Sequence, residues 1–194
     1  MATDISNMMS DNVLLIDFSY ADQVAFDLTV NFERMLERRI PKADLAHWLD
    51  CVALDGGITP GENEIQAIFL YDKNKRISCF TPSDAEKDIN GKAFKDNLGE
   101  FSMEAYPVAE GVTDMTEFYI ETLRVLLNNE KIKNIILVPN AEKYGTSVCS
   151  MVKKDGKGKS ITILAMQPQI GIGFNQQILG YSLMSALGIR GDEL

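Results

Sequence analysis

The chain has few of the residues on which common catalytic sites depend. It contains one histidine, His47, and three widely spaced cysteines, Cys51, Cys79 and Cys149. Zinc sites built from histidine and cysteine need more ligands than these, and an odd number of cysteines without a C-x-x-C pair does not form a disulfide framework. No G-x-S-x-G or G-x-x-x-x-G-K-[ST] motif is present, which argues against a serine hydrolase and a P-loop. We interpret the cysteines as buried structural thiols.

Basic residues and long apolar runs are also scarce. The chain has 19 Lys and Arg against 28 Asp and Glu, a formal net charge of −9, which argues against a dedicated binder of nucleic acid or anionic membranes. No run approaches the roughly 20 apolar residues of a membrane-spanning helix, and no basic region leads into an apolar core near the first residue. We expect a cytoplasmic protein in which residues 1–194 form one domain and residues 1–11 are a flexible N-terminus.

The apolar pattern predicts strands that alternate with helices. Apolar runs typical of buried strands lie at residues 13–17, 65–72, 134–140 and 160–167, and an alternating pattern predicts a strand at 100–108. Helical spacing predicts helices at residues 21–40, 45–55, from Thr113 to 131, 145–154 and 174–187. The fold class that follows is α/β: a mainly parallel central sheet with helices on both faces, joined by right-handed crossovers in a Rossmann-like three-layer sandwich.

Three segments lead to more specific expectations. Residues 72–75, DKNK, followed by RISCF at 76–80, favour a β-hairpin over a strand that simply leads into a loop. Residues 81–99 are polar and are expected to form a surface connection with a short helix. The final helix carries apolar residues on more than one face, which is compatible with a homo-oligomer or a protein partner as well as with a helix that only covers the sheet.

Acidic residues follow the predicted strands at positions where a parallel sheet would bring them together. Asp17 ends the first strand, Asp72 ends the second, and Asp114 begins a helix on which Glu117 and Glu121 could share its face. Carboxylates at this edge would suit Mg²⁺ or Mn²⁺, which prefer oxygen ligands and can align a water for phosphodiester attack. The structural alternative is that Asp114 caps its helix and the glutamates are solvated.

Over roughly residues 12 to 167 the order of elements resembles the PIN-like superfamily, and its NYN-type ribonuclease branch in particular. The similarity is carried by four segments: VLLIDFSY at 13–20, IFLYD at 68–72, GVTDMTEFYIETL at 111–123, and IILVPNAEKYG at 135–145 followed by DGKGKSITIL. In that family the first-strand acid, the acid that opens the later helix and an acidic segment after the fourth strand hold the catalytic metal. The resemblance therefore implies that Asp17 and Asp114 are metal ligands.

The chain departs from the family pattern at several of these positions. Tyr20 stands where NYN proteins carry Asn, and Ala141 and Lys143 stand where the acidic segment has aspartates. Glu142 is the acid that remains nearby, and its use would need a shift of one residue. The chain thus resembles a degenerate member of the family.

Three functional hypotheses follow. The first is a PIN/NYN-like binding or regulatory module that has lost or nearly lost nuclease activity. The second is an active Mg²⁺- or Mn²⁺-dependent ribonuclease with Asp17, Asp114, Glu117 and Glu142 as catalytic residues, although the acidic net charge disfavours RNA as a partner. The third is a small-molecule-binding α/β domain in which GIGF at 171–174 and the loop at Asn140 line a pocket.

Overall fold

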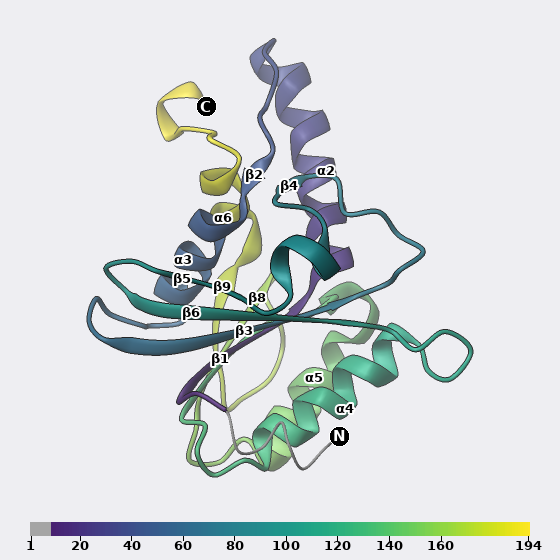
Figure 1. The fold of residues 1–194 in the computed structure, drawn as a ribbon, viewed down its shortest axis with the longest axis vertical. Coiled ribbons are helices and arrows are strands. Elements are labelled where there is room, and N and C mark those ends of the chain that lie inside the picture. Colours follow the sequence, from purple (N-terminus) through teal and green to yellow (C-terminus); the bar gives the residue numbers. More distant parts are fainter. Residues whose placement is uncertain (1–8) are drawn as a thin grey trace.

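The computed structural model describes residues 9–194, which build a seven-stranded sheet covered by helices on both faces (Figure 1). The fold is α/β, with a mostly parallel central sheet in a three-layer sandwich, as the sequence predicts. Residues 1–8 of the segment expected to be flexible lie outside the described residues. Met9 is buried among the apolar residues of one core. No helix of the described part of the chain has the length and apolar character needed to cross a membrane.

The strand order explains where a ligand site is expected. The sheet runs β5-β6-β3-β1-β7-β8-β9. Its strands are β1 (Asn12–Asp17), β3 (Asn63–Tyr71), β5 (Lys92–Lys95), β6 (Gly99–Pro107), β7 (Asn134–Val138), β8 (Ser160–Ala165) and β9 (Asn175–Ile178). All neighbours pair in parallel except β5 with β6. The parallel strands therefore follow the doubly wound order 3-2-1-4-5-6, in which the direction of winding reverses at β1.

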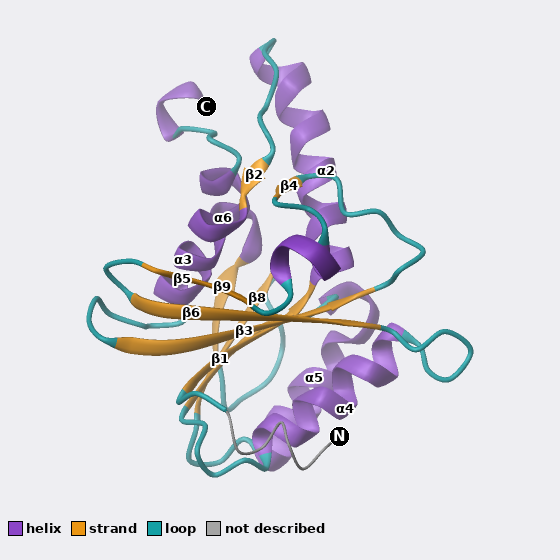
Figure 2. Ribbon diagram, viewed as in Figure 1, coloured by secondary structure: helices purple, strands orange, loops and turns teal. Residues whose placement is uncertain are grey.

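This reversal places the helices on opposite faces of the sheet, because successive parallel crossovers have the same right-handed sense. The helices α2 (Phe18–Leu36), α3 (Leu45–Asp55) and α6 (Leu179–Ala186) share one core. The helices α4 (Met115–Leu127) and α5 (Ala141–Asp155) share the other. Figure 2 shows these two groups on either side of the strands, with the far end of α2 extending well beyond the sheet.

Alternation along β1 decides which way its last residue points. Leu14 and Ile16 belong to the core under α2, α3 and α6, whereas Val13 and Leu15 belong to the core under α4 and α5. Successive side chains of a strand point to opposite faces. Asp17, two residues after Leu15, is therefore directed toward the α4–α5 face.

The prediction of a hairpin at residues 72–80 is wrong. The segment after β3 is a loop that ends in β4 (Phe80–Thr81), which pairs in parallel with β2 (Ala43–Asp44) in a separate two-stranded sheet. The Asp22 carboxylate accepts the backbone N–H groups of Ser78 and Cys79, and the Phe80 ring packs beside Phe18 and Trp48. These contacts to distant residues fix the conformation of the loop, and no local sequence pattern predicts them.

Other boundaries also differ from the expectation. Residues 175–178 form β9, so the last helix begins at Leu179 and not at 174. The first helix ends at Leu36, before Pro41, because Glu37 adopts a left-handed conformation with φ 52°. The connection at 81–99 is mostly exposed but contains β5 and a π-helix, η1 (Ala85–Ile89), whose Ala85 and Ile89 are buried. Cys79 and Cys149 are buried as expected, whereas Cys51, also expected to be buried, is half-buried; Trp48 is buried as well.

Candidate functional site

A cleft lies at the carboxyl ends of the parallel strands, where the doubly wound order places ligand sites. It consists of a cavity of about 620 Å³ and a neighbouring one of about 210 Å³. The two share Asp72, Lys75, Met115 and Lys143 in their linings. Asp17, at the end of the central strand β1, lines the smaller cavity. The edge of the sheet at which the sequence predicts a group of acidic side chains is thus the edge that contains these two cavities.

Asp17 is buried, and both of its carboxylate oxygens are engaged. Its Oδ1 accepts the backbone N–H of Tyr20 at 3.1 Å and so caps the N-terminus of α2. Its Oδ2 accepts the hydroxyl of Tyr144 at 2.6 Å. The residue that the family resemblance assigns to the metal therefore joins two helices from opposite faces of the sheet.

A kink in α5 brings Tyr144 to this position. Tyr144 itself has non-helical backbone angles, φ −135° and ψ 19°, within the first turns of the helix. Beside the next residue, Gly145, lies the side chain of Gln169, whose amide oxygen would be 2.6 Å from a Cβ built at that position. The loop that follows β8 therefore approaches α5 closely at this point. The Tyr144 ring packs against Tyr119, whose hydroxyl donates to the backbone oxygen of Leu15.

Burial controls the protonation of these groups. Burial raises the pKa of Asp17, while the Tyr144 hydroxyl, the Tyr20 N–H and the charges of Lys75 and Lys143 act to lower it. Burial also raises the pKa of Tyr20 to about 12, helped by the charges of Glu142 and Asp17. The same causes, burial first and the Asp17 charge second, raise the pKa of Tyr144. Both tyrosines therefore stay protonated at neutral pH and can donate hydrogen bonds but not accept a proton.

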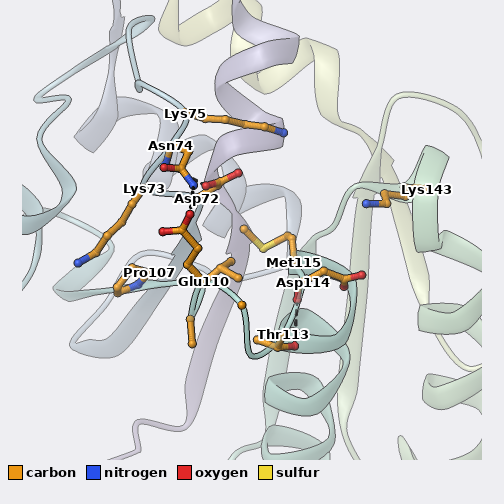
Figure 3. Close-up of a pocket in the computed structure, with 13 residues that line it drawn as sticks. Asp72, Lys73, Asn74, Lys75, Pro107, Glu110, Thr113, Asp114, Met115 and Lys143 are labelled. Atoms are coloured by element: carbon orange, nitrogen blue, oxygen red, sulfur yellow. Dashed lines mark hydrogen bonds between the residues drawn. The ribbon is translucent and has the colours of Figure 1, made fainter.

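Two lysines face each other across the cleft. Lys75 comes from the loop after β3 and Lys143 from the first turn of α5, and Figure 3 shows their nitrogens directed into the space between these elements. Among residues 9–194, neither ammonium group has a carboxylate within ion-pair distance, whereas other lysines, such as Lys95 and Lys133, do. Both cations line the larger cavity and the smaller one.

Uncharged polar groups complete the smaller cavity, whose lining also includes Ser19, Tyr20, Gln23 and Asn140. The Tyr20 hydroxyl is buried and forms no hydrogen bond of normal geometry in the described part of the chain, and the Glu142 carboxylate, which raises its pKa, is the acceptor that lies near it. Buried polar atoms are seldom left unpaired in native proteins. An unpaired donor in the wall of a polar cavity is consistent with a position that a ligand or water completes.

The remaining predicted acids have structural roles. The Asp114 side chain accepts the backbone N–H of Glu117 at 2.9 Å and caps α4, as the structural alternative expects. Glu117 accepts the Thr113 hydroxyl, and Glu121 forms an ion pair with Arg124. Neither glutamate lines the two cavities. Glu142 is exposed in the first turn of α5.

These positions do not fit a Mg²⁺ or Mn²⁺ site. Asp17, Asp72 and Asp114 reach the same edge of the sheet, but the described residues contain no group of three or more His, Cys, Asp and Glu side chains that could hold a metal ion. Both oxygens of Asp17 are already hydrogen-bonded, and Lys143 occupies the wall where the family pattern has an acid. Mg²⁺ is commonly held by one or two carboxylates with water completing an octahedral set, but here Lys75 and Lys143 line the same cavity as Asp17 and Asp72, and these cations oppose the binding of a divalent cation.

Two further sequence features lie away from the cleft. GIGF at 171–174 belongs to the loop that packs on α5, where a Cβ at Gly171 would touch the Phe174 ring and Cys149. It lines neither cavity of the cleft. In the turn after α5, which is part of the DGKGKSITIL segment, Lys159 donates hydrogen bonds to the backbone oxygens of Asn129 and Ile132. These bonds stabilise the fold.

The sequence did not predict that Lys75 and Lys143 line the same cleft. Lys143 was visible as a departure from the family pattern, but Lys75 falls in the segment interpreted as a hairpin turn. The bond between Tyr144 and Asp17 was missed as well, because it depends on the kink in α5.

Comparison with protein families gives one match. The model of DUF6621, a family of unknown function, matches residues 6–194, and because this is nearly the whole sequence the chain belongs to that family. No curated protein and no solved structure matches the chain.

Proposed function

We propose that this member of the DUF6621 family is a binding module of PIN/NYN-like architecture that does not act as a metal-dependent nuclease. Its ligand is a small polar molecule with an anionic group, such as a phosphate or a carboxylate, held between Lys75 and Lys143. One observation carries the proposal: two lysines without an ion-pair partner in the described chain line the same cavity as Asp17, whose oxygens are both occupied.

The lysines favour an anion because an ammonium group in a cavity wall gains more from an ionic partner than from water alone. The N-terminus of α5 adds to this preference, since the first turn of a helix carries partial positive charge. Lys143 lies in that turn, and the Asn140 side chain caps it. Ser19, Gln23 and the Tyr20 hydroxyl supply further polar groups for the rest of the ligand.

A small ligand is favoured over RNA. The net charge of −9 opposes the approach of a polyanion, and RNA binding draws most of its affinity from many phosphate contacts. The smaller cavity, about 210 Å³, is lined by Asp17 and Asp72 as well as by the two lysines. This balance of charges suits a compact ligand with one anionic group and hydrogen-bonding groups around it.

The strand order and the position of Asp17 support the PIN/NYN-like architecture, while Lys143, Tyr144 and Ala141 at the acidic segment support loss of the catalytic metal. The cytoplasmic location expected from the sequence belongs to the same proposal. The active ribonuclease is the competing function, and it makes a different prediction for metal binding.

Calorimetric titrations with inorganic phosphate and with Mn²⁺ test the proposal. We expect weak phosphate binding that falls about tenfold or more in Lys75→Gln and Lys143→Gln, because each removes one charged hydrogen-bond donor. Lys153→Gln, in the last turn of α5, is the matched control and should bind phosphate as the native chain does. Mn²⁺ should give no binding at micromolar concentrations.

The contrary result would be micromolar Mn²⁺ binding that is abolished by both Asp17→Asn and Asp114→Asn. Asparagine can cap a helix as aspartate does, so these substitutions keep the α2 and α4 caps and separate loss of a metal ligand from loss of structure. In that case the ribonuclease hypothesis would replace ours, and RNA cleavage would be assayed next. Phosphate binding that is equal in all lysine variants would also refute the proposed site.

A further inference from the structure

The strand β9 is an edge of the sheet whose outer side is open. It pairs with β8 on one side only, and within residues 9–194 no backbone hydrogen bond is formed on its other side. Asn175, Gln176 and Gln177 are exposed. An unpaired edge presents a row of N–H and C=O groups that matches another strand. The opposite edge, β5, carries Lys92 and Lys95, charges of the kind that discourage such pairing.

The chain around β9 carries no charge. Residues 161–189 contain no Asp, Glu, Lys, Arg or His, although charged residues make up 24% of the sequence. Two copies of a chain with a net charge of −9 repel each other over most of their surfaces. This stretch therefore brings no like charges of its own into a contact between two copies.

Exposed apolar side chains flank β9 on both faces of the sheet. Ile170 and Ile172 are 99% and 66% exposed in the loop before β9, which packs on α5. Tyr181 is 71% exposed in the first turn of α6, on the opposite face. Large apolar side chains around an open strand supply the burial that backbone hydrogen bonds alone do not give to an interface.

We propose that β9 pairs in antiparallel fashion with β9 of a second copy of this chain, so that two seven-stranded sheets join into one. A strand that pairs antiparallel with itself is self-complementary, which is the property that a two-fold symmetric interface requires. The axis stands perpendicular to the sheet and passes beside Gln177, which then faces its own copy, because such an axis keeps each side chain on its own face of the sheet. Each face is then continuous across the dimer, with Tyr181 beside its own copy on one face and the loop with Ile172 beside its own copy on the other.

This inference is independent of the proposed ligand. The cleft lies at the end of β1, and two strands, β7 and β8, separate β1 from β9. The dimer therefore leaves both cavities open, and either proposal can fail without the other.

Sedimentation equilibrium of the full chain tests the dimer. We expect a mass of twice the 21.6 kDa chain mass at micromolar concentrations. Gln177→Glu places like charges across the axis, and Tyr181→Glu buries a charge in the flank, so each should raise the dissociation constant about tenfold or more. Val112→Glu, at a residue 81% exposed between β6 and α4, is the control and should remain dimeric.

Hydrogen exchange provides a second measurement that does not depend on variants. Amides of residues 175–178 should become more protected as the protein concentration rises through the dissociation constant, while those of β5 should not change. A monomer at all concentrations, or a dimer that both glutamate variants leave unchanged, would overturn the proposal. Circular dichroism of each variant separates dissociation from unfolding.

Discussion

At the scale of single residues, Asp17 connects parts of the molecule that come from opposite faces of the sheet. It caps α2 through Oδ1 and holds α5 through the Tyr144 hydroxyl. Its burial raises its pKa, so the ionised carboxylate is maintained by these hydrogen bonds and by Lys75 and Lys143. A buried carboxylate of this kind opposes folding at neutral pH unless its partners compensate for lost hydration.

The substitution Tyr144→Phe is expected to lower the free energy of unfolding by about 1.5–3 kcal/mol at neutral pH, because it removes a hydrogen bond to a charged group. A raised acid pKa contributes stability below the unfolded-state pKa, and that stability is lost as the pH rises through the folded-state pKa. The Tyr144 hydroxyl opposes this shift, so its loss should cost less in acid, where Asp17 is protonated. Urea unfolding at neutral and acid pH measures both values.

The matched control is Tyr181→Phe, which removes a hydroxyl from an exposed ring and, at protein concentrations below the dissociation constant of the proposed dimer, should leave the free energy of unfolding unchanged at either pH. If Tyr144→Phe were equally harmless at neutral pH, Asp17 would not depend on that hydroxyl. The Oδ2 atom of Asp17 would then be available to a ligand, which would contradict the role of the Tyr144 hydroxyl as its hydrogen-bond donor.

At the scale of elements, α3 is joined to the turn between β5 and β6 by two carboxyl groups. Burial, a hydrogen bond from the protonated Asp50 carboxyl to Asp96 and the charge of Asp96 raise the pKa of Asp50 to about 7, with a smaller contribution from Asp44. Asp96 also accepts the backbone N–H of Leu98, which fixes the turn. The two carboxyl groups can share a proton but cannot both ionise without repulsion.

We therefore expect the stability of the native chain to depend on pH through Asp50. Since its folded-state pKa is raised from 3.8 to about 7, its contribution is complete below the unfolded-state value and is lost as the pH rises through about 7. Asp50→Asn should remove this part of the pH dependence, because asparagine does not titrate. Thermal unfolding across this range compares it with Asp88→Asn, an exposed control on η1. An Asp50→Asn profile parallel to that of the native chain would contradict the shared proton.

At the scale of the whole molecule, one sheet carries both apolar cores, since residues of β1 alternate between them. Loss of either core would expose one face of the same strands. The expectation from the sequence that residues 1–194 form a single domain thus leads to a prediction about cooperativity.

Unfolding is expected to occur in one transition. Trp48 is the only tryptophan in the sequence and lies in the core under α2, α3 and α6, so its fluorescence reports on that face. Far-ultraviolet circular dichroism reports on all helices. The two signals should coincide in urea, as in a two-state transition. A fluorescence transition separate from the loss of helix would mean that the two faces unfold independently.

Elements with strong local patterns, and the edge of the sheet where they converge, could be predicted from the residues alone. The runs that form β1, β3, β7 and β8 are apolar enough to be buried on both faces, and alternation of such strands with amphipathic helices implies a parallel sheet. That topology brings Asp17, Asp72 and Asp114 to one edge. The cap at Asp114 could also be predicted, because it depends on residues three apart in the chain.

Features that depend on distant partners could not be predicted, because they follow from the folding of the whole chain. The polar residues 175–178 form a strand because the open edge of β8 offers them hydrogen bonds, and the loop before Phe80 is fixed by Asp22, more than 50 residues earlier in the chain. Lys75 and Lys143 meet across a cleft because their loops follow strands on either side of β1. Local sequence patterns record which residues are buried, whereas pairing between remote segments is settled by the packing of the whole chain.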